Sequence, residues 1–191
     1  MLTRTLAIAA LSLALLSGCG DDAAPTYDAA ADGSRYDAEQ QHSDFDLGDP
    51  DWFNAEIDLP DGRTVSMYYA KNKGLAEQHY SPDADGWTAP RIIYQTDTDP
   101  CQGITLEEQD GTVAVIADWN GYCYDGEPPN ESIAGVASGD LNHWDTDQTK
   151  GFDGWSSVTL SDGGSKAVWS HHSDRLTWTD GDGFDKQMGG D

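Results

Sequence analysis

The feature that most constrains the fold is a recurring Asp-Gly pair, each time followed by a short apolar run. The three segments begin at Asp61 (DGRTVSMYYA), Asp110 (DGTVAVIADW) and Asp162 (DGGSKAVWSHH). Asp and Gly favour tight turns, and a short apolar run bounded by turn residues is typical of a β-strand. The spacing of about fifty residues predicts three repeats of one antiparallel unit. Allowing a one-residue slip, the repeats align Met67 with Val115 and Val168, and Tyr68 with Ile116 and Trp169.

Composition supports an all-β protein with a turn-rich domain over residues 51–186 and a short tail over 187–191. Of the 35 acidic residues 28 are Asp, which suits turns, and only seven are Glu, which suits helices. No segment shows a convincing helical period, so helix should be scarce. Val113 to Ala117 is apolar at every position, which indicates a strand covered on both faces. The net charge of −25 repels nucleic acid and anionic lipid headgroups, which excludes both as partners of the domain.

The N-terminus has the pattern of an export signal. Arg4 precedes an apolar run from Leu6 to Leu16 that is too short to span a bilayer. The following Leu16-Ser17-Gly18-Cys19 resembles the lipobox of bacterial lipoproteins. This resemblance implies a signal peptide over residues 1–18, a lipid on Cys19, and localisation at the extracytoplasmic face of the cell membrane. The alternative is an ordinary secretory signal with an unrelated cysteine.

Two further expectations follow from export. Residues 19–50 are acidic and lack apolar periodicity, so we expect a flexible tether between the membrane and the domain. Cys101 and Cys123 are the remaining cysteines, and a disulfide between them is the default outside the cytoplasm. Closing a loop of about 22 residues would stabilise the domain by roughly 3 kcal/mol.

A second resemblance concerns the segment from Ser81 to Pro90 (SPDADGWTAP). It resembles a degenerate Asp-box of sialidase-like β-propellers. In that family the Ser and Asp tie a turn between the outer two strands of a blade, and the Trp packs between blades. The resemblance carries these structural roles to Ser81, Asp83, Gly86 and Trp87, although Gly and Trp fall one place off the pattern. Later copies keep Ser138, Asp140 and Trp144, or Ser173, Asp174 and Trp178.

The repeats therefore predict propeller-blade-like sheets, with a small β-sandwich or barrel as the alternative. Three repeats are too few for an ordinary closed propeller, which has four to eight blades. Sialidases bind the substrate carboxylate with three arginines, and this domain has Arg63, Arg91 and Arg175 near its repeats. Surface or ion-paired arginines are the favoured interpretation, and no catalytic residue is assigned.

No metal site or cofactor is predicted from the remaining candidates. Histidines next to each other on a strand point to opposite faces, so His171 and His172 should not chelate together, and His143 stands apart from them. The acidic clusters at 97–99 and 180–185 suit hard cations but lack a complete calcium-loop pattern. The aromatic residues Trp119, Tyr122 and Tyr124 flank Cys123, and core packing is favoured over a ligand-binding platform.

These observations favour a membrane-anchored, non-enzymatic binding or structural module of the bacterial envelope. Its ligand would be a glycan or a protein. The alternative is an envelope glycan hydrolase of sialidase-like propeller descent. The two interpretations make different structural predictions. A hydrolase of this descent requires the three arginines to converge in a pocket with a tyrosine and a carboxylate, whereas a binding or structural module does not.

Overall fold

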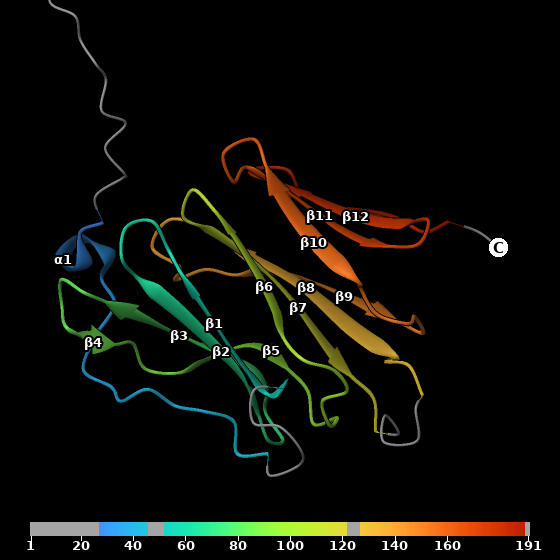
Figure 1. The fold of residues 1–191 in the computed structure, drawn as a ribbon, viewed down its shortest axis with the longest axis horizontal. Helices are drawn as coiled ribbons and strands as arrows, with labels where there is room; N and C mark the ends of the chain where they lie inside the picture. Colours follow the sequence, from blue (N-terminus) through green and yellow to red (C-terminus); the bar gives the residue numbers. More distant parts are fainter. Residues whose placement is uncertain (1–26, 46–51, 122–126, 190–191) are drawn as a thin grey trace, which may run out of the picture.

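A computed structural model describes residues 27–45, 52–121 and 127–189. Within these ranges the chain is all-β, with one helix of four residues, α1 (Ala29–Asp32), as the scarcity of helical periodicity predicts. The strands form three antiparallel sheets that follow one another along the chain (Figure 1). None of them closes on itself, so the barrel alternative is wrong for the described strands.

Each sheet corresponds to one predicted repeat, and its strands follow chain order. Sheet A consists of β1 (Asn54–Asp58), β2 (Thr64–Ala70), β3 (Gly74–Ser81), β4 (Gly86–Trp87) and β5 (Arg91–Gln95), and both β4 and β5 pair with β3. Sheet B consists of β6 (Thr105–Gln109), β7 (Thr112–Trp119), β8 (Glu131–Ala137) and β9 (Asp145–Lys150). Sheet C consists of β10 (Ser157–Ser161), β11 (Lys166–His171), β12 (Asp174–Thr179) and β13 (Gly183–Gln187).

The Asp-Gly pairs form the hairpins that open each sheet, between its first and second strands. In sheet B, Gln109 pairs with Thr112, which leaves only Asp110 and Gly111 in the loop. Both have positive φ, of 52° and 82°, as a type I′ turn requires. Gly accepts this conformation without cost, and Asp tolerates it better than most residues. Local turn chemistry therefore sets the register at the start of the repeat.

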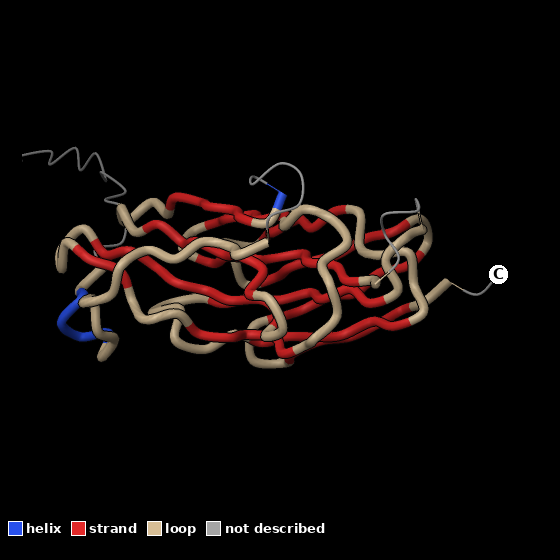
Figure 2. The backbone as a smooth tube through the Cα atoms, turned by 90° about the horizontal axis from the view of Figure 1, so that it is seen from below, coloured by secondary structure: helices blue, strands red, loops and turns tan. Residues whose placement is uncertain are grey.

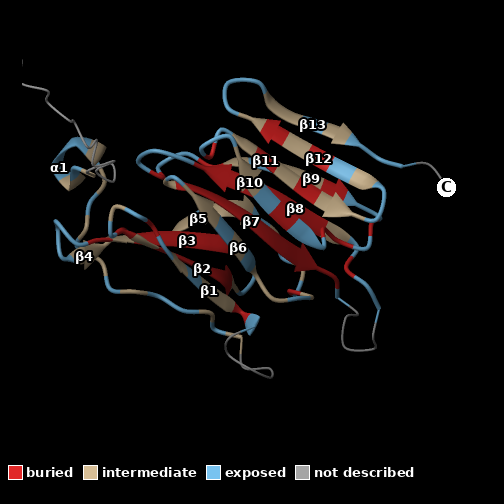
Figure 3. Ribbon diagram, turned by 45° about the horizontal axis from the view of Figure 1, so that its top comes forward, coloured by how far each residue is buried: buried red, intermediate tan, exposed pale blue. Residues whose placement is uncertain are grey.

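The sheets stack in the order A, B, C, so sheet B is covered on both sides (Figure 1). Figure 2 shows that strands run through most of the described chain. On β7, Val113, Val115 and Ala117 face sheet A, while Ala114 and Ile116 face sheet C. Every residue of β7 is buried, which confirms the prediction of a strand covered on both faces (Figure 3). The first strands of the sheets are neighbours, with β1 beside β6 and β6 beside β10.

The register of the hairpins corrects the predicted alignment of the repeats. Counted from the first pair of each hairpin, Met67 and Val115 correspond to Trp169 and not to Val168. Trp169 is fully buried in the core between sheets B and C, whereas Val168 lies on the opposite face. The alignment was wrong because the turn of the third repeat has one more residue than the alignment allowed. A shift of one residue along a strand moves a side chain to the opposite face of the sheet.

The outer face of sheet C is polar and ends the stack. One row across this face runs from Thr159 through Val168 and Thr177 to Asp185. The neighbouring row, which faces sheet B, contains Val158, Trp169 and Leu176, and all three are buried. A polar outer face allows a terminal unit to meet water, as capping units do in repeat proteins.

Residues 27–45 dock on the domain, with α1 at one end of the sheets and residues 38–45 along sheet A, and this corrects the expected tether for that part of residues 19–50. Ala38 pairs with Trp87 at the sheet edge. Farther along, the backbone N–H of Gln41 donates to the Gln78 side chain at 2.8 Å, and the Ser43 hydroxyl donates to the Tyr69 carbonyl at 2.7 Å. Gln78 is fully buried beneath this part of the N-terminal segment. The segment has little apolar surface, but it supplies hydrogen bonds to buried polar groups of the sheet.

Candidate functional site

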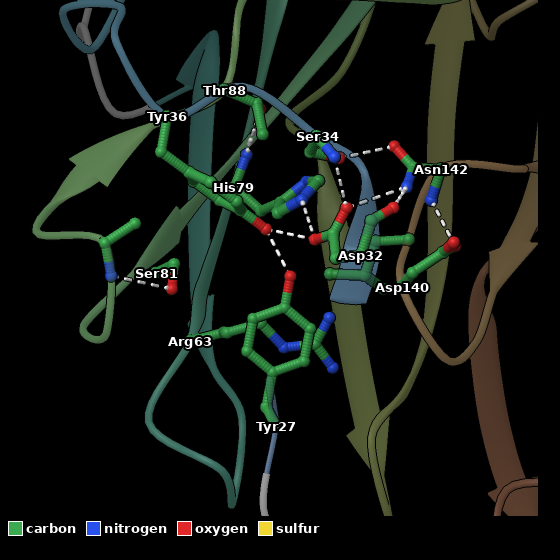
Figure 4. Close-up of polar contacts among 12 residues, drawn as sticks. Tyr27, Asp32, Ser34, Tyr36, Arg63, His79, Ser81, Thr88, Asp140 and Asn142 are labelled. Carbon is green, nitrogen blue, oxygen red and sulfur yellow. Dashed lines mark hydrogen bonds and ion pairs between the residues drawn. The ribbon is translucent and has the colours of Figure 1, made fainter. Parts of the chain in front are cut away.

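A cluster of polar side chains lies beside α1 (Figure 4), which is at one end of the stacked sheets (Figure 1). Asp32, the last residue of α1, is the centre of this cluster, and its side chain is 1 % exposed. It accepts hydrogen bonds from the Ser34 backbone at 2.8 Å, from the Asn142 amide at 2.9 Å, and from the Tyr36 hydroxyl. Asn142 comes from the loop between β8 and β9, so Asp32 links the N-terminal segment to sheet B.

The hydrogen bonds decide the protonation state of Asp32. Burial acts to raise its pKa, but the bonds from Ser34, Tyr36 and Asn142 together outweigh burial and hold the pKa below its ordinary value. For Tyr36, burial and then the hydrogen bond and charge of Asp32 raise the pKa, and they outweigh the charge of Arg63 and a hydrogen bond with Ser34, which lower it. The pair is therefore a carboxylate that accepts a hydrogen bond from a neutral phenol.

Glu77 and His79 form a second buried contact within the cluster. They are two residues apart on β3 and both face sheet B. His79 Nδ1 lies 2.7 Å from Glu77 Oε1, and the other oxygen of Glu77 accepts from Arg91 at 3.0 Å. His79 Nε2 lies 3.7 Å from Asp32 Oδ2 and has no hydrogen-bond partner. A carboxylate–histidine pair occurs in general-base catalysis, but no described hydroxyl or thiol contacts Nε2 as a nucleophile would.

Two hollows are lined in part by residues of this cluster. The larger has a volume of about 370 Å³ and includes Tyr27, Asp32, Asp61 and Arg63 in its lining. The smaller, about 180 Å³, includes Glu77, His79 and Arg91. The three arginines therefore do not converge. Arg63 lines the larger hollow and Arg91 the smaller, while Arg175 lies on β12 and donates to the carbonyls of His172 and Asp174.

Both arginines near the cluster already have protein partners. Arg63 donates to Asp61 Oδ2 from Nε and Nη2, at 3.0 and 2.8 Å, and lies over the Tyr27 ring at 3.9 Å. Arg91 donates to Glu77 and to the carbonyls of Leu141 and Asn142. The Arg91 contacts join sheet A to the β8–β9 loop of sheet B, whereas Arg63 pairs within the β1–β2 turn and contacts the N-terminal segment. These contacts agree with the interpretation of the arginines as ion-paired residues.

The residues of the Asp-box-like segment lie at the turn between β3 and β4. Ser81 is fully buried, and its hydroxyl accepts a hydrogen bond from the Ala84 backbone at 3.3 Å across that turn. Asp83 is exposed in the turn, and Gly86 begins β4. Trp87 is half-buried, contacts Tyr80, and pairs with Ala38. It does not pack between sheets as the resemblance implied, because β4 lies at an edge that the N-terminal segment covers.

The later tryptophans do lie between sheets: Trp144 belongs to the core of sheets A and B, and Trp178 to that of B and C. Trp119 is also in the first core, where its ring contacts Tyr69 and Tyr94. This agrees with core packing of Trp119. Tyr122 and Tyr124 lie outside the described residues.

The histidine pair corrects one sequence-based expectation. The rings of His171 and His172 are not on opposite faces; their centroids are 4.4 Å apart. His172 has a φ of 48° in the turn after β11, so the alternation of a regular strand ends before it. His143 is exposed and lies 3.1 Å from Asp145. In the part of the chain that the structure describes, no group of three or more His, Cys, Asp or Glu side chains is arranged to hold a metal ion.

Cys19 and Cys123 lie outside the described residues, so lipidation and the disulfide remain predictions. The backbone N–H of Cys101 donates to the Asp118 carbonyl at 2.9 Å, and Pro100 pairs with Trp119. Cys101 is thus next to the end of β7, from which the chain continues to Cys123. We expect mass spectrometry of the unreduced mature protein to give a cross-linked peptide pair. Two alkylatable thiols in native protein would contradict the pairing.

Sequence reasoning did not identify Asp32, Tyr36, Glu77 or His79. A signal existed for the last two, since Glu-Gln-His within a strand places the first and third residues on one face. Asp32 and Tyr36 gave no such signal, because their partners are distant in sequence. No protein-family model, curated protein or solved structure matches the chain, so the site is interpreted from its geometry.

Proposed function

We propose that the chain is a lipid-anchored, extracytoplasmic module of the bacterial cell envelope that binds a ligand without transforming it. The observation that carries this proposal is the docking of the chain from Tyr27 onward, after a lipobox-like signal ending at Cys19. Eight residue steps separate the two positions and span at most about 28 Å. A lipid on Cys19 would therefore keep the α1 end of the domain near the membrane surface. The described residues contain no helix with the length and apolarity of a membrane span.

The same geometry supports a binding or structural role over glycan hydrolysis. The arginines do not gather around one pocket, and all three are bound to acidic side chains or carbonyls. An enzyme that stabilises a charged transition state needs such groups aimed at the reacting atoms. The hollow beside α1 is instead lined mainly by charged residues, which suits the binding of a polar ligand.

We further propose that the three sheets are related to propeller blades. Each sheet proceeds from its first to its last strand in chain order, and the next sheet begins with a strand beside the first strand of the preceding one. Docking of residues 38–45 along sheet A and the polar face of sheet C support a stack that is complete with three units.

The anchor is tested by replacing Cys19 with alanine. The unaltered protein should partition with the membrane fraction and into the detergent phase, whereas the variant should appear in a soluble fraction or in the medium. Cys101→Ala serves as the control, because it removes a cysteine outside the lipobox and should leave membrane partitioning unchanged. Membrane partitioning of the Cys19→Ala variant would refute the anchor.

A further inference from the structure

The larger hollow, here called the acidic hollow, is formed by four segments that are far apart in sequence. They are the start of the N-terminal segment, the β1–β2 and β6–β7 turns, and the β8–β9 loop. Its lining includes Tyr27, Asp28, Asp61, Arg63, Asp110 and Asp140. Its volume of about 370 Å³ falls within the range of small-molecule sites.

Charge is distributed in two layers around the acidic hollow. Asp28, Asp110 and Asp140 are exposed and form a negative rim. Arg63 is only 2 % exposed and lies deeper, with its guanidinium directed to the space beneath α1 (Figure 4). Its Nε and Nη2 donate to Asp61, which is also buried, but its Nη1 has no hydrogen-bond partner.

The unpartnered Nη1 is a second observation, independent of the acidic rim, that points to a ligand. Buried donors in folded proteins nearly always have an acceptor, so Nη1 calls for an oxygen atom at this place. A carboxylate suits a guanidinium best, because the hydrogen bond is then charge-assisted. The three aspartates of the rim favour positively charged groups elsewhere on the same ligand. The described carboxylates are not grouped to hold one metal ion, so separate cationic groups on one molecule fit them better.

We propose that the acidic hollow binds a basic amino acid, or a peptide end with the same groups. The ligand's carboxylate accepts from Arg63 Nη1, its ammonium groups face the rim aspartates, and its alkyl chain passes the Tyr27 ring. This inference rests on the proposed binding function and names the ligand class of that site. A net positive ligand is favoured because acidic groups outnumber the one arginine in the lining.

The test is calorimetric titration of the mature chain with lysine and with three analogues. Cadaverine lacks the carboxylate, 6-aminohexanoate lacks the α-ammonium group, and glutarate has two carboxylates but no ammonium group. We expect saturable binding of lysine, binding of the first two analogues weaker by about tenfold or more, and no binding of glutarate. Affinity for lysine should fall with added salt, since the rim is exposed.

Substitutions assign the groups of the ligand to their partners. Arg63→Gln should reduce lysine affinity to that of cadaverine while changing cadaverine affinity by less than about threefold, because only lysine has the carboxylate. Asp110→Asn should weaken both ligands. Asn tolerates the positive φ at this position, so the turn is preserved. Asp83→Asn, in the exposed β3–β4 turn, should weaken neither.

Three results would overturn the proposal: no saturable binding of lysine, equal binding of lysine and cadaverine by the unaltered chain, or equal loss of both ligands in a folded Arg63→Gln variant. The second result needs no substitution, so the test stands even where Arg63→Gln fails to fold. Acetyl-Gly-Lys and its C-terminal amide distinguish a peptide end from the free amino acid. Failure of binding would leave the membrane fractionation of the Cys19→Ala variant unaffected, so the two proposals fail separately.

Discussion

Replacing Asp118 with asparagine is expected to stabilise the domain at pH 8 by about 3 kcal/mol. Asp118 is 2 % exposed on the face of β7 toward sheet C, and its Oδ1 has no hydrogen-bond partner. Burial raises the pKa of this carboxyl to about 7, against the opposing effect of a hydrogen bond with Ser132. Holding it ionised in the folded state therefore costs about 4 kcal/mol, from roughly three pH units at 1.36 kcal/mol each. Asparagine avoids the charge but keeps part of the desolvation cost.

The effect has a defined pH window and sign. Between about pH 4 and pH 7 the folded state holds a proton on Asp118 that the unfolded state has lost. The contribution of Asp118 therefore falls as pH rises through this window, and is constant above it. Urea unfolding of the Asp118→Asn variant and the unaltered protein should show a stability difference that grows from pH 4 to pH 8. Asp83→Asn is the matched exposed control. A difference independent of pH would refute the raised pKa.

Removing residues 1–45 is expected to destabilise the domain by about 5 kcal/mol or more, whereas removing residues 1–26 should leave it unchanged. The longer deletion takes away the partners of buried groups. Gln78 loses the Gln41 N–H and the Glu39 carbonyl, and His79 loses its contacts with Asp32 and Tyr36. Each buried polar group left without a partner costs about 1–3 kcal/mol. Loss of the stacked contact between Phe45 and Phe53 adds to this.

Urea unfolding of the two deletion variants distinguishes two roles of residues 27–45: a segment docked on the domain, or a mere connection to the membrane. If residues 27–45 only connected the domain to the membrane, both deletions would unfold at the same urea concentration. That result would contradict the docked arrangement. Phe45→Ala in the full mature chain gives an intermediate test, because it removes one apolar contact and leaves the backbone contacts of the segment in place.

The β class, the three repeats and the double burial of β7 were predictable because they depend on local chemistry. An Asp-Gly pair such as Asp110-Gly111 favours a tight turn, and an apolar run such as Val113 to Ala117 must be covered on both faces. Each of these signals is a short stretch of sequence, and it occurs once in every repeat.

Residues 27–45 and the cluster beside α1 depended on tertiary contacts that no local pattern contains. Polar segments without periodicity are ordinarily unable to offset their ordering entropy, so composition indicated a tether. Here Gln41 meets the buried amide of Gln78, and Asp32 meets Asn142, which is 110 residues away in the chain. The sequence by itself therefore determined the strands, the turns and the repeat. Only the tertiary structure decided which polar side chains are buried together, because their partners come from segments that become neighbours when the sheets stack.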